Sequence, residues 1–106
     1  MASDFCVVQT TCANEEASRT LAQAVLEARL AACVQMWPIR SLYLWQGKVA
    51  DEPEMLVQFK ARSTDFEALA AKITALHSYD VPEIIRLDIA EGSAAYLNWI
   101  EDVTGR

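Results

Sequence analysis

Segments with the pattern of a β-strand alternate along this chain with segments that have the pattern of an α-helix. The extended segments cover 4–11, 33–45, 54–61 and 84–89, and helical patterns follow the first, third and fourth of them. The resulting order, β-α-β-β-α-β-α, predicts an α+β fold: a ferredoxin-like βαββαβ sandwich with a C-terminal helix. Right-handed crossovers put both main helices on one face of the sheet. The length of 106 residues favours a single domain over 1–106.

Local signals mark the start of the first helix. Asn14 is a suitable N-cap, and the two glutamates that follow it face the positive end of the helix dipole. An apolar residue then recurs every three or four positions. This periodicity predicts a helix that ends at about Leu30 or Ala32.

The second and third helices have start signals of their own. Thr64 and Glu67 match a capping box, in which the Thr oxygen accepts and the Glu lies at the third helical position. The apolar stripe of this helix runs from Phe66 to His77. Gly92 and Ser93 precede the last helix, whose expected inward residues are Leu97, Ile100 and Val103.

The middle of the chain predicts a long hairpin. Apolar and polar residues alternate over 54–61, which indicates one buried and one solvated face. Pro38 suits an edge strand better than a central one. Gln46-Gly47-Lys48 supplies a turn with a residue free to adopt a positive φ, so the tip is expected between Gly47 and Pro53.

Charge and apolar content limit the classes of partner. Nine basic and fifteen acidic residues give a net charge of −6, which argues against nucleic acid and against an anionic membrane surface. Hydrophobic residues make up 53% of the chain, which favours association with copies of itself. The first residues lack the basic and apolar regions of a leader, and no apolar run approaches a membrane span. We therefore expect a cytoplasmic protein.

The cysteines and the single histidine are the candidates for chemistry. Cys6, Cys12 and Cys33 form no CxxC pair and are expected to be thiols. Cys12 precedes a helix N-terminus, a position that lowers a thiol pKa, so it is either a metal-binding thiolate or an uninvolved turn residue. Cys33 is expected in the core. His77 is either a residue favoured at a helix C-terminus or a metal ligand.

No enzyme signature appears. The chain has no phosphate-binding glycine loop and no nucleophile–base pair, so we expect a protein that is not an enzyme. Aromatic residues such as Trp45 favour a core or a subunit interface over a cofactor site. Lys60, Tyr79 and Glu83 are candidates for a polar cluster at one end of the sheet.

Five stretches, in chain order, resemble the motifs of one family. They are Thr11–Glu16, Arg29–Val34, Ser41–Lys48, His77–Ile84 and Tyr96–Ile100. They resemble, in turn, T-C-P-N-E, R-L-A-A-C-V, S-x-Y-x-W-x-G-K, H-P-Y-E-V-P-E-I and Y-L-x-W-I. They follow one another in order along most of the chain, and the chain resembles CutA, the divalent-cation tolerance family.

The resemblance implies a ferredoxin-like homotrimer linked to tolerance of copper and other divalent cations. In the family pattern, a cysteine near the end of the first strand and two adjacent histidines bind copper. Here Leu76 precedes the only histidine, and the cysteine position falls on Thr11, one residue before Cys12. The fold therefore carries over more completely than the metal site.

These observations give two functional hypotheses. The first is a trimer that binds copper or another divalent cation weakly through His77, Cys12 and Glu83. The alternative is a trimeric small-ligand signalling or structural protein resembling PII-type trimers, an analogy at the level of fold. In either case Lys60, Tyr79, Glu83 and Trp45 are expected to line a cleft between subunits.

Overall fold

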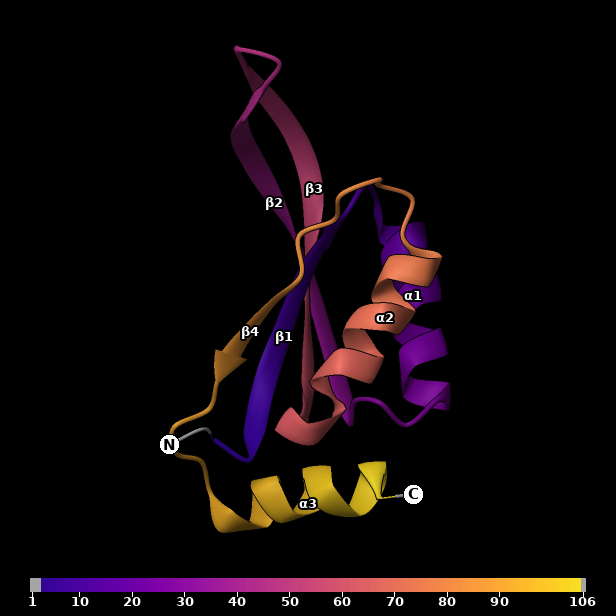
Figure 1. Cartoon of the computed structure of the whole chain (residues 1–106), viewed down its shortest axis with the longest axis vertical. Helices are drawn as coiled ribbons and strands as arrows, with labels where there is room; N and C mark the ends of the chain where they lie inside the picture. The colour runs from indigo at the N-terminus through magenta and orange to yellow at the C-terminus, as the bar shows by residue number, and fades with distance from the viewer. Residues whose placement is uncertain (1–2, 106) are drawn as a thin grey trace.

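The computed structural model describes residues 3–105 and contains a four-stranded sheet with three α-helices (Figure 1). Residues 1, 2 and 106 lie outside the described residues. The expectation of no leader rests partly on residues 1 and 2, so it too lies partly outside them. The strands are β1 (Phe5–Cys12), β2 (Cys33–Trp45), β3 (Lys48–Arg62) and β4 (Ile85–Asp88), and the helices are α1 (Glu15–Glu27), α2 (Phe66–Leu76) and α3 (Ala94–Thr104). A short 3₁₀ turn, η1 (Ser63–Asp65), precedes α2. This order confirms the predicted βαββαβ arrangement with a C-terminal helix.

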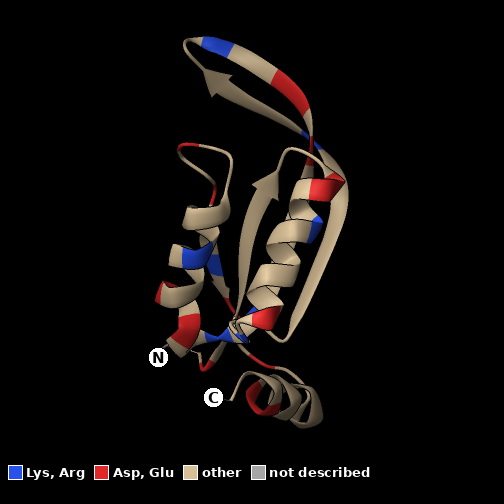
Figure 2. Ribbon diagram, turned by 90° about the vertical axis from the view of Figure 1, so that its right-hand side faces the viewer, with Lys and Arg blue, Asp and Glu red and all other residues tan. Residues whose placement is uncertain are grey.

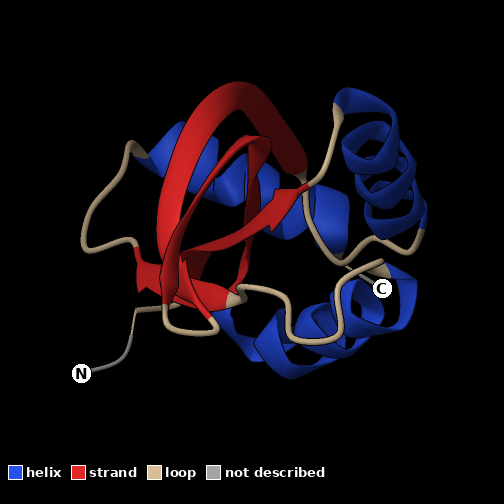
Figure 3. Ribbon diagram, turned by 90° about the horizontal axis from the view of Figure 1, so that it is seen from above, coloured by secondary structure: helices blue, strands red, loops and turns tan. Residues whose placement is uncertain are grey.

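All strand pairs are antiparallel, in the order β2-β3-β1-β4. The edge position of β2 accommodates Pro38, as expected. Side chains of β1 and β3 alternate between two faces, and one face is buried beneath α1 and α2 (Figure 3). Val8, Val57 and Phe59 on this face are fully buried with Leu69 of α2. We call the opposite face of the sheet the open face.

The third helix lies across the end of the sheet where β1 begins and β3 ends (Figure 1). Arg62 at the end of β3 joins this helix to the body, because its guanidinium bonds Glu101 at 2.7 Å and Asp65 at 3.0 Å. Ser93 caps the helix, as predicted, by accepting from the Tyr96 N–H. The inward set differs from the prediction: Val103 is exposed, and Thr104 is buried in its place.

The boundaries of α1 and of the hairpin differ from the sequence prediction. Asn14 caps α1 as expected, with its side-chain oxygen 2.8 Å from the Ala17 nitrogen. The helix ends at Glu27, because Arg29 takes a left-handed φ of 57°. The hairpin tip is the two-residue turn Gln46-Gly47, both with positive φ, so β3 begins earlier than predicted, at Lys48.

The predicted capping box of α2 is wrong. Thr64 lies within η1, and Asp65 occupies the N-cap position without a side-chain capping bond. The Asp65 carboxylate instead pairs with Arg62, so a tertiary ion pair takes the place of the local motif.

Candidate functional site

Two clefts flank the end of β1, one on each face of the sheet. The Cys12 cleft, on the helix side, has a volume of about 410 Å³. The Tyr79 cleft, on the open face, has a volume of about 780 Å³. Thr11 lines the second cleft and Cys12 the first, because neighbouring strand residues point to opposite faces.

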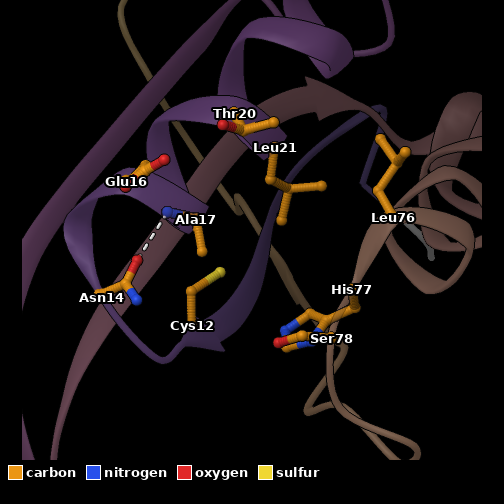
Figure 4. A pocket seen from close by; sticks show the side chains of 9 residues that line it. All are labelled: Cys12, Asn14, Glu16, Ala17, Thr20, Leu21, Leu76, His77 and Ser78. Atoms are coloured by element: carbon orange, nitrogen blue, oxygen red, sulfur yellow. Dashed lines mark hydrogen bonds between the residues drawn. The ribbon is translucent and has the colours of Figure 1, made fainter.

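The Cys12 cleft lies between the start of α1 and the end of α2 (Figure 4). Its lining residues are Cys12, Asn14, Glu16, Ala17, Thr20, Leu21, Leu76, His77 and Ser78. Two of the predicted metal-binding residues, Cys12 and His77, therefore share one cleft, to which they come from separate segments. Figure 4 draws no bond between them.

The surroundings of Cys12 favour the second of its two predicted alternatives, an uninvolved thiol. This residue is the last of β1 and only 3% exposed. Burial raises the pKa of the Cys12 thiol, and a hydrogen bond with Ser18, which lowers the pKa, has the smaller effect. The backbone N–H of Ala17, in the first turn of α1, already donates a hydrogen bond to Asn14 Oδ1. Cys12 is therefore a neutral buried thiol rather than an activated one.

The other two thiols also differ from one another. Cys6 is fully buried in the core. Cys33, which was expected in the core, is only partly buried and lies beside Tyr96 of α3. That expectation is wrong because the Cys33 side chain lies on the open face of β2, opposite Lys60.

His77 is the C-cap residue of α2, and both of its ring nitrogens have partners. Nδ1 accepts from the Tyr79 N–H at 3.1 Å, so Nε2 carries the proton and donates to the Thr11 carbonyl at 2.7 Å. The His77 and Tyr79 rings also touch, with centroids 4.7 Å apart. This histidine holds the 77–79 segment against β1, and neither nitrogen has a free lone pair for a metal.

Glu83 lies on the other side of the sheet from the Cys12 cleft. Its carboxylate accepts from Gln9 Nε2 at 2.9 Å, and Gln9 in turn accepts from Gln58. Glu83 lines the Tyr79 cleft only. Within residues 3–105 no three His, Cys, Asp or Glu side chains converge on a point that fits a metal ion. The set of His77, Cys12 and Glu83 is thus not brought together within one chain.

The expected intersubunit set is brought together in part. Trp45, Tyr79 and Glu83 all line the Tyr79 cleft. Lys60 does not line it, and its ammonium donates to Gln35 Oε1 at 2.7 Å. Lys60 is six residues from Glu54 along β3, which corresponds to about 20 Å at the rise of a strand.

Glu54 and Thr11 belong to the Tyr79 cleft and were missed by the sequence analysis. The Tyr79 hydroxyl donates to Glu54 Oε2 at 2.7 Å. Burial, and then this carboxylate, raise the pKa of Tyr79 well above its ordinary value. The alternation over 54–61 placed Glu54 on the solvated face of β3, and this placement was the one sequence signal that could have identified Glu54 as a cleft residue.

Comparison with known proteins assigns the class of this small α+β fold. The family model of the CutA1 divalent ion tolerance protein matches residues 6–103. The structure of CutA1 from Shewanella sp. SIB1 has a TM-score of 0.96 at 33% identity, with 100% of both chains covered. The chain belongs to the CutA1 divalent ion tolerance family, which confirms the resemblance found in the sequence.

Two relatives illustrate how far the similarity extends. The divalent-cation tolerance protein CutA of Thermus thermophilus is 46% identical over 100 residues, 93% of this chain and 97% of that protein. A chloroplastic CutA protein of Arabidopsis thaliana is 43% identical over 99 residues, 92% of this chain. This chain spans about half of that relative, 54% of its length. Among residues 3–105, no helix has the length and apolarity needed to cross a membrane.

Proposed function

We propose that this chain forms a homotrimer that acts in tolerance to divalent cations, is not an enzyme, and binds copper or a similar cation weakly. In this proposal residues 1–106 form one domain, the partners are copies of the chain and metal ions, and the protein acts in the cytoplasm without binding nucleic acid or membranes. Family membership supports the role in tolerance. The observation that carries the assembly is the β2–β3 hairpin, which projects from the body (Figure 1) and exposes apolar side chains.

The end of this hairpin exposes large apolar side chains on both strands. Leu44 is 80% exposed, Val49 66%, Leu42 64% and Trp45 63%. Over 48–54 the strand β3 pairs with β2 alone, so both outer edges of the hairpin end are unpaired among the described residues, and such a patch promotes association with another chain. A further copy of the same chain would cover these residues and end the exposure. Family membership supports three as the number of copies.

Weak metal binding follows from the state of the two residues in the Cys12 cleft. A metal on His77 must displace the Tyr79 N–H or the Thr11 carbonyl from the ring. A metal on Cys12 must remove a proton that burial retains. Glu83 contributes to the same site only if a second chain supplies it. We therefore expect affinity below that of a relative with a complete set of ligands.

Two measurements test this proposal. Light scattering on the purified protein should give three times the chain mass at micromolar concentration, and a stable monomer would contradict the trimer. Copper titration by calorimetry should give weak binding that falls in His77→Ala and changes less in Cys12→Ala. Thermal melts of both variants would separate lost binding from lost folding. Equal copper binding by wild type and a folded His77→Ala would show that His77 has only its structural role.

A further inference from the structure

A line of polar side chains crosses the open face in the body of the sheet. Gln35, Gln58 and Gln9 are register partners on the neighbouring strands β2, β3 and β1. Gln58 Nε2 donates to Gln9 Oε1 at 2.9 Å, and Gln9 Nε2 donates to the Glu83 carboxylate at 2.9 Å. On the other side, the Lys60 ammonium donates to Gln35 Oε1 at 2.7 Å. We call this set of side chains the polar line.

The two ends of the polar line carry opposite charges. The end beside β2 is the Lys60 ammonium, and the end toward β4 is the Glu83 carboxylate. Each bonds a neutral glutamine amide, and neither forms an ion pair with another residue of 3–105. Because glutamines lie between them, the two charges do not meet within the single chain.

Apolar side chains border the polar line on the same face. Trp37 and Leu56 are register partners on one side of it, and Val7 and Leu87 are register partners on the other. Trp37 and Leu87 are exposed in the single chain. Trp37 also lies on the same face of β2 as Trp45, because an even number of positions separates them. The surface that the proposed assembly covers at the hairpin end therefore continues on the body.

A second copy of this chain is the occupant that fits both features. A wholly apolar partner would cover the two charges and the glutamine amides without giving them partners, which is unfavourable. A copy placed head to tail supplies a carboxylate to Lys60 and an ammonium to Glu83 from the ends of its own line. Head-to-tail contacts close into rings, whereas a two-fold contact pairs identical patches.

We propose that the polar lines of neighbouring copies join end to end, with Lys60 of one copy paired with Glu83 of the next, and that this pairing sets the register of the assembly. Sliding one copy by two residues along a strand, about 7 Å, would place each charge against an apolar row. The inference rests on the proposed homotrimer and adds the residues that select its geometry.

Charge reversals on the full chain test the pairing. Lys60→Glu and Glu83→Lys each place like charges at every contact, so each variant alone should dissociate at a concentration at least tenfold higher than wild type. The double variant restores opposite charges and should assemble within about threefold of wild type. Light scattering over a range of concentrations, in non-denaturing urea, measures these shifts. Thermal melts check that each chain is folded.

Mixing the two single variants separates pairing between copies from pairing within a chain. Mixed assemblies bring the carboxylate introduced by Lys60→Glu beside the ammonium introduced by Glu83→Lys. They should therefore exceed the share that random mixing gives in native mass spectrometry. The matched controls, Lys72→Glu and Glu91→Lys, introduce the same charges outside the polar line. They should assemble like wild type and mix at random.

Two results would overturn the inference and leave the homotrimer in place. Unchanged assembly in both single reversals would show that the two ends do not meet. Rescue in the double variant without preferential mixing would place the pairing within one chain. If Lys60→Glu does not fold, Lys60→Gln and Glu83→Gln form a double-mutant cycle, in which additive losses would refute the pairing. A monomeric wild type would instead contradict the proposed function, and this inference with it.

Discussion

The paired strands β2 and β3 pass through two environments along their length. In the body, Met55, Val57 and Phe59 are at most 9% exposed, beneath α1 and α2. Toward the tip, Leu44 and Val49 are opposite each other in the same ladder and are 80% and 66% exposed. Both ends are rich in apolar side chains, and the backbone pairing is continuous between them.

This difference teaches that apolar content identifies a surface to be covered without identifying what covers it. The helices of this chain cover the body, and no helix reaches the tip (Figure 1). Charge does not explain the difference either, because both signs occur on the hairpin and on the body (Figure 2). We expect the body to be stabilised within the chain and the tip to be stabilised by assembly.

The largest expected effect lies in the body. Leu69 is fully buried in the core cluster, so Leu69→Ala should lower the free energy of unfolding by about 2–5 kcal/mol. Denaturant unfolding measures this loss. The matched control is Leu44→Ala in the tip, which should leave the unfolding of the chain itself nearly unchanged. Equal losses of unfolding free energy in Leu69→Ala and Leu44→Ala would contradict the expectation that only the body is stabilised within the chain.

Trp45→Ala tests the tip from the other direction. Trp45 is 63% exposed in the single chain, so its loss should cost little within the chain. At an interface it should instead weaken assembly by about 2 kcal/mol, the scale of an aromatic hot spot. Light scattering over a range of concentrations measures the shift. A normal trimer with unchanged concentration dependence would refute the interface assignment.

The hairpin turn should respond to backbone conformation alone. Gly47 has a φ of +77°, and a Cβ added there would meet nothing within 4 Å. Gly47→Ala should therefore cost about 1–2 kcal/mol from left-handed strain without any clash. Gln46→Asn, at the neighbouring positive φ, should be neutral or slightly stabilising, since Asn-Gly favours this turn. Thermal melts should show a lower melting temperature for Gly47→Ala and an unchanged or slightly higher one for Gln46→Asn.

The smallest expected effect is the contribution of Cys12, a residue of the body, to the free energy of unfolding at alkaline pH. Burial raises the pKa of Cys12 above 9.0, so folding favours the protonated thiol. This contribution is fully present below about pH 9 and is lost as the pH rises through the folded pKa. Cys12→Ala should show a shallower alkaline decline in unfolding free energy than wild type. Identical slopes would indicate that the thiol has an ordinary pKa in the folded state.

The order of the elements could be predicted because each segment carries its own period. Met55, Val57 and Phe59 alternate with polar residues, and they are buried as that alternation indicates. The ends of the helices and strands depend on backbone conformations that produce no periodic pattern in the sequence. Arg29 ends α1 in a left-handed conformation that usually favours glycine, so the apolar pattern suggested three to five further residues.

The candidate site could be predicted less well because its contacts are long-range. His77 was found as a candidate, but its partners are the Thr11 carbonyl and the Tyr79 N–H, and backbone atoms have no signature in a sequence. Glu54 contacts Tyr79 only because the register of β3 brings it beside the loop after α2. The separation of Glu83 from Cys12 likewise follows from which face of the sheet each residue reaches.

The central position of β1 has a consequence for the order of folding. The chain makes this strand first, yet its neighbours come late: Phe5 pairs with Arg62, and Cys6 pairs with Asp88, some eighty residues away. The β2–β3 hairpin, closed by a two-residue turn, can form within about 1–10 μs. At a synthesis rate of about 5–20 residues per second, β1 waits several seconds for β4 to emerge. During synthesis the hairpin and β1 can therefore pair before β4 completes the sheet.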